Sequence, residues 1–165
     1  MKVYLVRHAD AIPAAPVLPD ASRHLSADGR ASFRETARRL MDDGVRPSLI
    51  LSSPLVRALQ TADILAERLE YEGEVSSSLL LGPGFDLEKM NEILLSFPGE
   101  TEIALVGHEP DIGRIVARLL GRPGGFAMPK GGVAAFSFPD SGKRDKGTFV
   151  WLRDGERRVD DLSDL

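Results

Sequence analysis

The chain has 165 residues, with a hydrophobic share of 42% and a charged share of 28%, which is typical of a globular protein of one domain. Its formal net charge of -4 argues against broad electrostatic binding to nucleic acid, and no apolar run approaches the roughly 20 residues of a membrane span. The chain contains no cysteine, which excludes disulfides and thiolate metal sites. With no signal-peptide pattern in its first residues, we expect a cytoplasmic protein.

The first segments predict a strand, a loop and a helix. KVYLV (2–6) is a continuous apolar run that ends at a polar pair, which is typical of a strand covered on both faces in a parallel sheet. Residues 11–24 include three prolines and predict an irregular surface loop. Ser26 can then cap a helix with apolar residues at helical spacing, which Gly44 ends.

Two further units follow the same order of strand and helix. SLILS (48–52) predicts a second strand, after which Ser53 can cap a helix with Pro54 in its first position. LLL (79–81) predicts a weaker strand, and the apolar spacing over 86–97 predicts the next helix.

The last third of the chain predicts three strands and one helix. EIALVGH (102–108) is the strongest later strand, and Pro110 opens the helix that follows it. GVAAFSF (132–138) and TFVWL (148–152) are expected to pair antiparallel, joined by a polar loop over 139–147.

This alternation predicts an α/β fold: a three-layer α/β/α sandwich with a mainly parallel central sheet, in a single domain over residues 1–165. Such sheets bind ligands at the carboxyl ends of their strands. There the sequence places Arg7 and His8 after the first strand, Arg57 after the second and His108 after the later one. We therefore expect these four side chains to share one edge of the sheet.

The residue types at that edge indicate a site for one phosphate group. Guanidinium groups bind phosphate bidentately, and Arg57 lies early in its helix, where free N–H groups and the helix dipole also favour an anion. A histidine flanked by arginines resists protonation and keeps a lone pair at neutral pH. His8 can then attack phosphorus.

Three segments carry a resemblance to a known family. LVRHADA, SSPLVRALQTA and LVGHEP resemble, in order and spacing, the three motifs of the histidine phosphatase (phosphoglycerate mutase-like) superfamily. The compact length, the stretch RHLSADG (23–29) and VGHEP are most similar to the SixA-type phosphohistidine phosphatases, over nearly the whole chain.

The resemblance implies a role for each matching residue. His8 would be the nucleophile that forms a phosphohistidine intermediate, and Arg7, Arg57 and His108 would be catalytic residues that hold the phosphoryl oxygens. Arg23 resembles an additional basic residue at the rim of the phosphate site. A covalent route of this kind needs no metal and no other cofactor.

The expected substrate is phosphohistidine on a protein. The larger phosphomonoesterases and mutases of the superfamily that this chain resembles share an additional acidic residue on an inserted segment. This residue protonates the leaving oxygen. This chain has only a short connection between Leu69 and Glu102, with no acid in a matching motif. An imidazole leaves from a phosphoramidate more easily than an alkoxide leaves from an ester, so a weak acid suffices.

Other functions stay open at this stage. The chain could hydrolyse small phosphate monoesters, or it could bind phosphoproteins without catalysis. It could also be a metallohydrolase that uses His8, Asp10, His108 and Asp111 as metal ligands, although two adjacent arginines would repel the cation. Asp10 can equally cap its loop, and His24 is expected to be an exposed loop residue. The expected partner is a phosphorylated protein or a small phosphorylated substrate, and neither nucleic acid nor a membrane.

Overall fold

The structure is a computed structural model that describes residues 1–139 and 146–165. Within these residues, seven strands form one sheet in the order β3-β2-β4-β1-β5-β6-β7. The strands are β1 (Lys2–Arg7), β2 (Leu49–Ser52), β3 (Ser76–Ser77), β4 (Glu102–Gly107), β5 (Val133–Ser137), β6 (Thr148–Asp154) and β7 (Arg157–Val159). The helices are α1 (Ala27–Asp42), α2 (Val56–Arg68), α3 (Leu87–Ser96) and α4 (Asp111–Leu119), with short 3-10 turns η1 (Asp20–Ser22), η2 (Leu79–Leu81) and η3 (Leu162–Asp164).

The sheet is mixed, and its parallel half is the one that strand-to-helix alternation predicted. β3, β2, β4 and β1 run parallel, whereas β5, β6 and β7 continue antiparallel from β1. β5 and β6 pair antiparallel as expected, and most of the loop predicted between them, residues 140–145, lies outside the described part of the chain. Because β2, β4 and β1 are neighbours, their carboxyl ends meet at one edge of the sheet.

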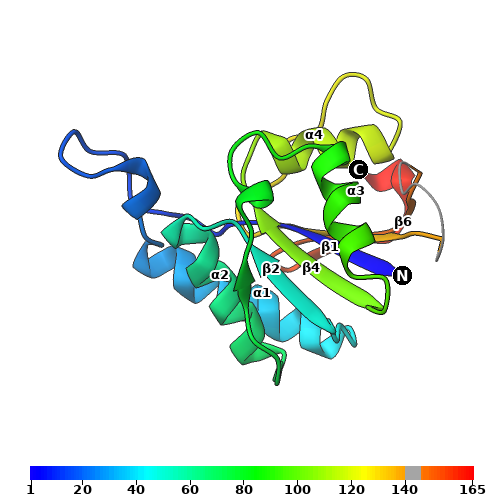
Figure 1. Cartoon of the computed structure of the whole chain (residues 1–165), viewed down its shortest axis with the longest axis horizontal. Helices are drawn as coiled ribbons and strands as arrows, with labels where there is room; N and C mark the ends of the chain where they lie inside the picture. Colours follow the sequence, from blue (N-terminus) through cyan, green and yellow to red (C-terminus); the bar gives the residue numbers. More distant parts are fainter. Residues whose placement is uncertain (140–145) are drawn as a thin grey trace.

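Helices cover both faces of the sheet and complete the three predicted layers, with α1 and α2 on one face and α3 and α4 on the other (Figure 1). β1 shows why its apolar run is continuous. Val3 and Leu5 pack toward α3 and α4, whereas Tyr4 and Val6 pack toward α1 and α2. All four side chains are buried, so neither face of this strand meets solvent.

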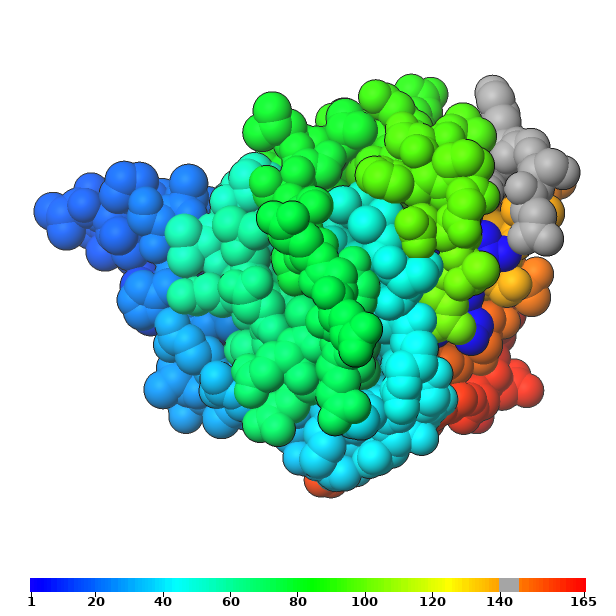
Figure 2. All heavy atoms as spheres, turned by 60° about the horizontal axis from the view of Figure 1, so that its bottom comes forward, coloured from blue at the N-terminus to red at the C-terminus, as the bar shows by residue number. Residues whose placement is uncertain are grey.

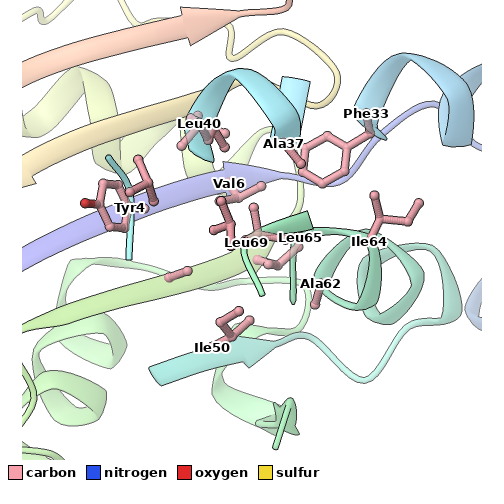
Figure 3. Close-up of a cluster of buried hydrophobic side chains, with 14 of the residues drawn as sticks. Tyr4, Val6, Phe33, Ala37, Leu40, Ile50, Ala62, Ile64, Leu65 and Leu69 are labelled. Atoms are coloured by element: carbon pink, nitrogen blue, oxygen red, sulfur yellow. The ribbon is translucent and has the colours of Figure 1, made fainter. Parts of the chain in front are cut away.

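The layer between α1, α2 and the sheet supports the edge where the polar residues lie. Phe33 and Leu40 of α1 and Leu65 of α2 meet Tyr4 and Val6 of the central strand (Figure 3). Burial of a side chain of this size contributes about 1.5–3 kcal/mol to the free energy of unfolding. α1 begins where the sequence predicts, because the Ser26 hydroxyl oxygen accepts a hydrogen bond of 2.9 Å from the Gly29 N–H.

The prediction of a strand over residues 79–81 is wrong. These residues form the 3-10 turn η2, and the short edge strand β3 precedes them and pairs with β2. The Ser78 hydroxyl oxygen accepts a hydrogen bond from the Leu80 N–H and starts the turn. Leu81 is buried, whereas Leu79 is 87% exposed, so the apolar run did not mark a buried strand.

The helix after β2 begins two residues later than predicted. α2 starts at Val56 with Leu55 as its N-cap, so Pro54 lies in the turn before the helix. Arg57 is still within the first turn of α2, as the sequence predicts.

The proline-containing segment 11–24 is a lobe that projects from the body of the molecule beside α1 and α2 (Figures 1 and 2). Its structure is mostly irregular, as predicted, apart from two isolated bridges and η1. In the described part of the chain, every helix is too short or too polar to cross a membrane.

Candidate active site

The structure brings the four predicted polar residues together at the carboxyl edge of the parallel strands. Arg7 ends β1 and lies level with Gly107, which ends β4, so His8 and His108 follow adjacent strand ends. The centroids of the two imidazole rings are 5.2 Å apart. Arg57 reaches the same place from α2, and its Nε lies 3.3 Å from His8 Nε2.

Hydrogen bonds define which nitrogen of His8 carries the proton. His8 Nδ1 lies 2.7 Å from the carbonyl oxygen of Ala9. A carbonyl oxygen only accepts hydrogen bonds, so Nδ1 carries the proton and Nε2 keeps its lone pair. The Nε–H of Arg57 donates to this lone pair. The site thus holds an imidazole whose unprotonated nitrogen faces a cationic donor.

The surroundings of His8 keep the imidazole neutral at physiological pH. Its pKa is lowered to about 4, and burial is the largest cause. The positive charges of Arg57, Arg7 and Arg23 lower the pKa further, while the hydrogen bond to the Ala9 carbonyl acts in the opposite direction. Nε2 therefore stays unprotonated over the whole neutral range.

His108 is neutral for a similar reason and is anchored by a serine. The pKa of His108 is lowered to about 4, and burial is the largest cause. Electrostatic interactions with His8 and Arg57 lower this pKa further. Its Nε2 lies 2.6 Å from the hydroxyl oxygen of Ser53, which is fully buried. Its Nδ1 is buried and has no hydrogen-bond partner among the described residues. The sequence indicated only a helix cap at Ser53, and this contact was not predicted.

Arg7 is anchored by one end of its guanidinium. Its Nη1 donates a hydrogen bond of 2.6 Å to the carbonyl oxygen of Met128, in the segment between α4 and β5. Its buried Nε has no partner among residues 1–139 and 146–165. A buried N–H without a partner is costly, and an anion at this edge would satisfy it.

The projecting lobe adds an acidic residue that the sequence analysis missed. Asp20 Oδ2 accepts a hydrogen bond of 3.0 Å from Arg57 Nη2, and the Asp20 main-chain carbonyl accepts one of 2.7 Å from Arg57 Nη1. Asp20 Oδ1 accepts a hydrogen bond of 2.9 Å from Nη1 of Arg23, whose Nε donates to the Ile12 carbonyl. Through Asp20, Arg23 joins the edge of this cluster. The spacing of Asp20 and Arg23 in a loop next to the first motif was the signal that could have indicated the pair.

The two carboxylates of the metal-binding alternative have hydrogen-bond partners of their own. Asp10 accepts a hydrogen bond of 2.8 Å from the Ser26 hydroxyl, and Asp111 accepts one of 2.6 Å from the Gly84 N–H. Across the described ranges, no group of three or more histidine or acidic side chains is placed to hold a metal ion. His24 is exposed, and its Nδ1 lies 2.9 Å from the carbonyl oxygen of the next residue, Leu25.

The cluster does not coincide with two cavities that lie beside α4. Two cavities of about 540 and 550 Å³ lie along α4, and both are lined by Arg114 and Arg118. Neither is lined by His8 or its basic neighbours. A single phosphoryl group is small and needs converging donors more than a deep cavity.

Comparison with known proteins identifies the family. The model of the histidine phosphatase superfamily (branch 1) matches residues 3–80, which include Arg7, His8 and Arg57. An uncharacterized protein of Picosynechococcus sp. PCC 7002 is 34% identical over 116 residues, which are 68% of this chain and 69% of the relative. The chain belongs to the histidine phosphatase superfamily.

Within this superfamily, two relatives extend the similarity beyond the range that the family model matches. The phosphohistidine phosphatase SixA of Escherichia coli K12 is 28% identical over 153 residues, which are 92% of each chain. The structure of the protein histidine phosphatase SixA complexed with tungstate has a TM-score of 0.78 and 27% identity, and the match covers 92% of this chain and 96% of that one. As a superfamily member with these relatives, the chain is a phosphatase with the histidine phosphatase fold.

Proposed function

We propose that this chain is a metal-independent phosphatase that hydrolyses phosphohistidine on a protein. In this proposal His8 carries the phosphoryl group covalently, and Arg7, Arg57 and His108 bind its oxygens. The observation that carries the proposal is the unprotonated Nε2 of His8, which lies 3.3 Å from the Arg57 Nε. A neutral imidazole beside fixed cationic donors has the arrangement that phosphoryl transfer to nitrogen requires.

The first step transfers the phosphoryl group to the enzyme. The Nε–H of Arg57 releases its hydrogen bond to His8 Nε2 as the phosphoryl group approaches. The freed lone pair attacks phosphorus, and the bond between phosphorus and the substrate imidazole nitrogen breaks. The leaving nitrogen takes the bonding electron pair and receives a proton from solvent. During this step negative charge spreads over the three equatorial oxygens, where Arg7, Arg57 and the His108 imidazole can stabilise it.

The second step restores the enzyme. A water oxygen attacks the phosphorus on His8, the bond from phosphorus to Nε2 breaks, and inorganic phosphate leaves. Nε2 keeps the electron pair, and the water proton goes to the phosphate. The low pKa of His8 favours this return to the neutral imidazole.

The carboxylates beside the site support a phosphoramidate rather than a phosphate ester as the substrate. Hydrogen bonds from Lys130 and Ser26 lower the pKa of Asp10, and those from Arg23 and Arg57 lower the pKa of Asp20. Both groups are ionised at neutral pH and hold no proton to donate. An alkoxide leaving group needs such a proton, whereas an imidazole departs with much weaker assistance.

The relatives agree with this substrate class. The E. coli relative is named a phosphohistidine phosphatase, and the solved relative is named a protein histidine phosphatase and was complexed with tungstate, an oxyanion. We take the same substrate class as the best proposal for this chain, with a phosphorylated protein as its partner.

A comparison of leaving groups tests the substrate. Purified enzyme is assayed with a phosphohistidine peptide or protein and with a panel of phosphate monoesters, and kcat/KM is measured for each. We expect a clear preference for phosphohistidine. A preference for the esters would contradict the substrate class, and binding of phosphoproteins without turnover would support a non-catalytic module.

Trapping of the intermediate tests the role of His8. Enzyme mixed with substrate labelled in the phosphoryl group and quenched at high pH, where phosphohistidine survives, should carry the label on His8. The variant His8→Ala should not carry the label, and His24→Ala should behave as the wild type because His24 is an exposed loop residue.

Removal of metal ions tests metal independence. Activity should be unchanged in excess chelator, and loss of activity there would contradict metal independence.

A further inference from the structure

The Asp20 carboxylate accepts a hydrogen bond from the Arg57 guanidinium, which in the proposed function binds the phosphoryl group of the substrate. We propose that Asp20 is a specificity-determining residue whose carboxylate competes with the phosphoryl group for Arg57. This inference rests on the proposed function, because it takes Arg57 as a ligand of the phosphoryl oxygens. It adds a residue from the projecting lobe that neither the motifs nor the family comparison indicates.

The hydrogen bonds of Arg57 show what the carboxylate occupies. Nε donates to His8, whereas Nη1 and Nη2 donate to the main-chain oxygen and the carboxylate of Asp20, at 2.7 and 3.0 Å. The outer pair of nitrogens is the end of a guanidinium that binds carboxylate or phosphate bidentately. A phosphoryl group on His8 can use this pair in the same way only after Asp20 has released it.

The charge of Asp20 opposes the binding of an anion as well. Its two carboxylate oxygens bridge Arg57 and Arg23, at 3.0 and 2.9 Å. One negative charge therefore offsets part of the positive charge that these two residues bring to the site. Hydrogen bonds from both arginines also keep the carboxylate ionised, since they lower the pKa of Asp20.

The two partners differ in how freely they can move. The Arg57 side chain is only 9% exposed and belongs to the first turn of α2, whereas the Asp20 side chain is 60% exposed. Asp20 lies in the short turn η1 within the blue lobe that projects at the left of Figure 2. An ion pair with one exposed partner is weak, so a phosphoryl group can displace the carboxylate while Arg57 stays in place.

This competition selects for a phosphoryl group that is carried by a larger partner. Free phosphate and small phosphate esters offer little beyond the phosphoryl oxygens, so displacement of Asp20 takes a large share of their binding free energy. A phosphorylated protein adds contacts outside the site and offsets this loss. The same competition helps inorganic phosphate to leave after hydrolysis, because Asp20 can return to Arg57.

A scaffold role for Asp20 makes the opposite prediction. If the carboxylate only held Arg57 and Arg23 in position for the substrate, its removal would loosen both side chains and weaken the binding of phosphate. If it competes, its removal tightens the binding of phosphate. The direction of the change therefore distinguishes the two roles.

The test measures the affinity of inorganic phosphate and of tungstate, by calorimetry and by product inhibition, at constant ionic strength. We expect Asp20→Asn to tighten phosphate binding by about tenfold, the effect of removing one negative charge a few ångströms from the ligand in a partly screened site. Asp20→Ser, which also removes the charge, is measured beside it to separate the charge from the shape of the side chain. The matched control is Asp42→Asn, since Asp42 is similarly exposed and is paired with Arg38 rather than with Arg57, and its effect should stay under about twofold.

Each result bears on one of the two proposals. Tighter phosphate binding in both Asp20 variants supports competition. Unchanged or weaker binding in both, with normal binding in the wild type, overturns the competitor role and leaves the proposed function standing. If neither the wild type nor the variants bind phosphate or tungstate, both proposals are overturned. A separate control is Arg57→Ala, in which loss of phosphate binding confirms that the measured site contains Arg57.

Discussion

The Nε of Arg57 lies 3.3 Å from the Nε2 of His8, and it donates its hydrogen to the lone pair of that nitrogen. The pair joins the first turn of α2 to the residue that follows β1, across 49 positions of the chain. A permanent cation next to the imidazole disfavours its protonation and gives the nitrogen a fixed direction. The pair thus links the electrostatics of the site to the nucleophile of the proposed reaction.

Replacement of Arg57 by lysine tests the geometry of this pair separately from its charge. Lysine keeps one positive charge but cannot donate at the same time to His8 and to phosphoryl oxygens from a planar group. We expect Arg57→Lys to lower kcat/KM for the phosphohistidine substrate by about 10²–10³-fold, as for the loss of one preorganised donor. Steady-state kinetics measure this, with Arg68→Lys at the exposed end of α2 as the control. Near-normal activity of Arg57→Lys would mean that only the charge matters.

The two histidines of the site should titrate well below the range usual for imidazole. The pKa values of His8 and His108 are both lowered to about 4, chiefly by burial. Nuclear magnetic resonance of the imidazole ring signals as a function of pH measures both directly. Midpoints near pH 4 would agree with the structure, and midpoints near pH 6.5 would show that the rings are solvated.

These depressed pKa values also make stability depend on pH. Below about pH 6.5 the unfolded chain takes up protons on these histidines, whereas the folded chain does so only near pH 4. The contribution to the free energy of unfolding is therefore complete above about pH 6.5 and is lost as the pH falls toward 4. Urea unfolding of the double variant His8→Asn, His108→Asn should depend less on pH in this window than that of the wild type. An equal dependence would assign the effect to other groups.

Ser53 should act as a positioning residue for His108. Its hydroxyl oxygen lies 2.6 Å from His108 Nε2, and both residues are buried. A hydrogen bond of this kind contributes about 0.5–1.5 kcal/mol, so we expect Ser53→Ala to lower kcat by roughly 2- to 13-fold if the full amount is lost in the transition state.

Ser52→Ala is the matched control for this change. The Ser52 hydroxyl is also fully buried, but it donates to the carbonyl oxygen of Ser53 and does not contact His108. If both variants lost activity equally, the effect would come from packing at the end of β2. A change in the titration of His108 in Ser53→Ala alone would show that the contact itself is responsible.

The layer of α1 and α2 should carry much of the stability that holds the site together. Phe33 is 1% exposed and packs in the cluster between α1, α2 and the sheet (Figure 3). We expect Phe33→Ala to lower the free energy of unfolding by about 3–5 kcal/mol in urea titrations. Leu79→Ala should change it by less than about 0.5 kcal/mol, because Leu79 is 87% exposed. A small effect of Phe33→Ala would mean that its pocket collapses around the gap.

The strand-to-helix pattern made the fold predictable, and its failures have physical causes. β1 could be recognised because all of its apolar residues are buried, on alternating faces. LLL at 79–81 was misread because a short apolar run has no periodicity that separates a strand from a turn. The later start of α2 reflects the uncertainty of helix ends, where Pro54 suited either the turn or the first helical position.

The candidate site was predictable where function follows strand ends and was missed where it depends on loop geometry. Arg7 ends a strand, and His8 and His108 directly follow strands, so their shared edge could be expected from the fold class. Asp20 meets Arg57 across 37 positions, from an irregular lobe whose path no local pattern specifies. The contact of Ser53 with His108 spans 55 positions, and its place before Pro54 gave it a sufficient local explanation as a cap.

A crystal structure of the enzyme with bound orthovanadate is the most direct test of the central claim. The account predicts vanadium bonded to His8 Nε2, with its oxygens contacted by Arg7, Arg57 and His108 and with the Asp20 carboxylate displaced from Arg57. Vanadate bound away from His8, or His8 turned so that Nε2 no longer faces the guanidiniums, would contradict it.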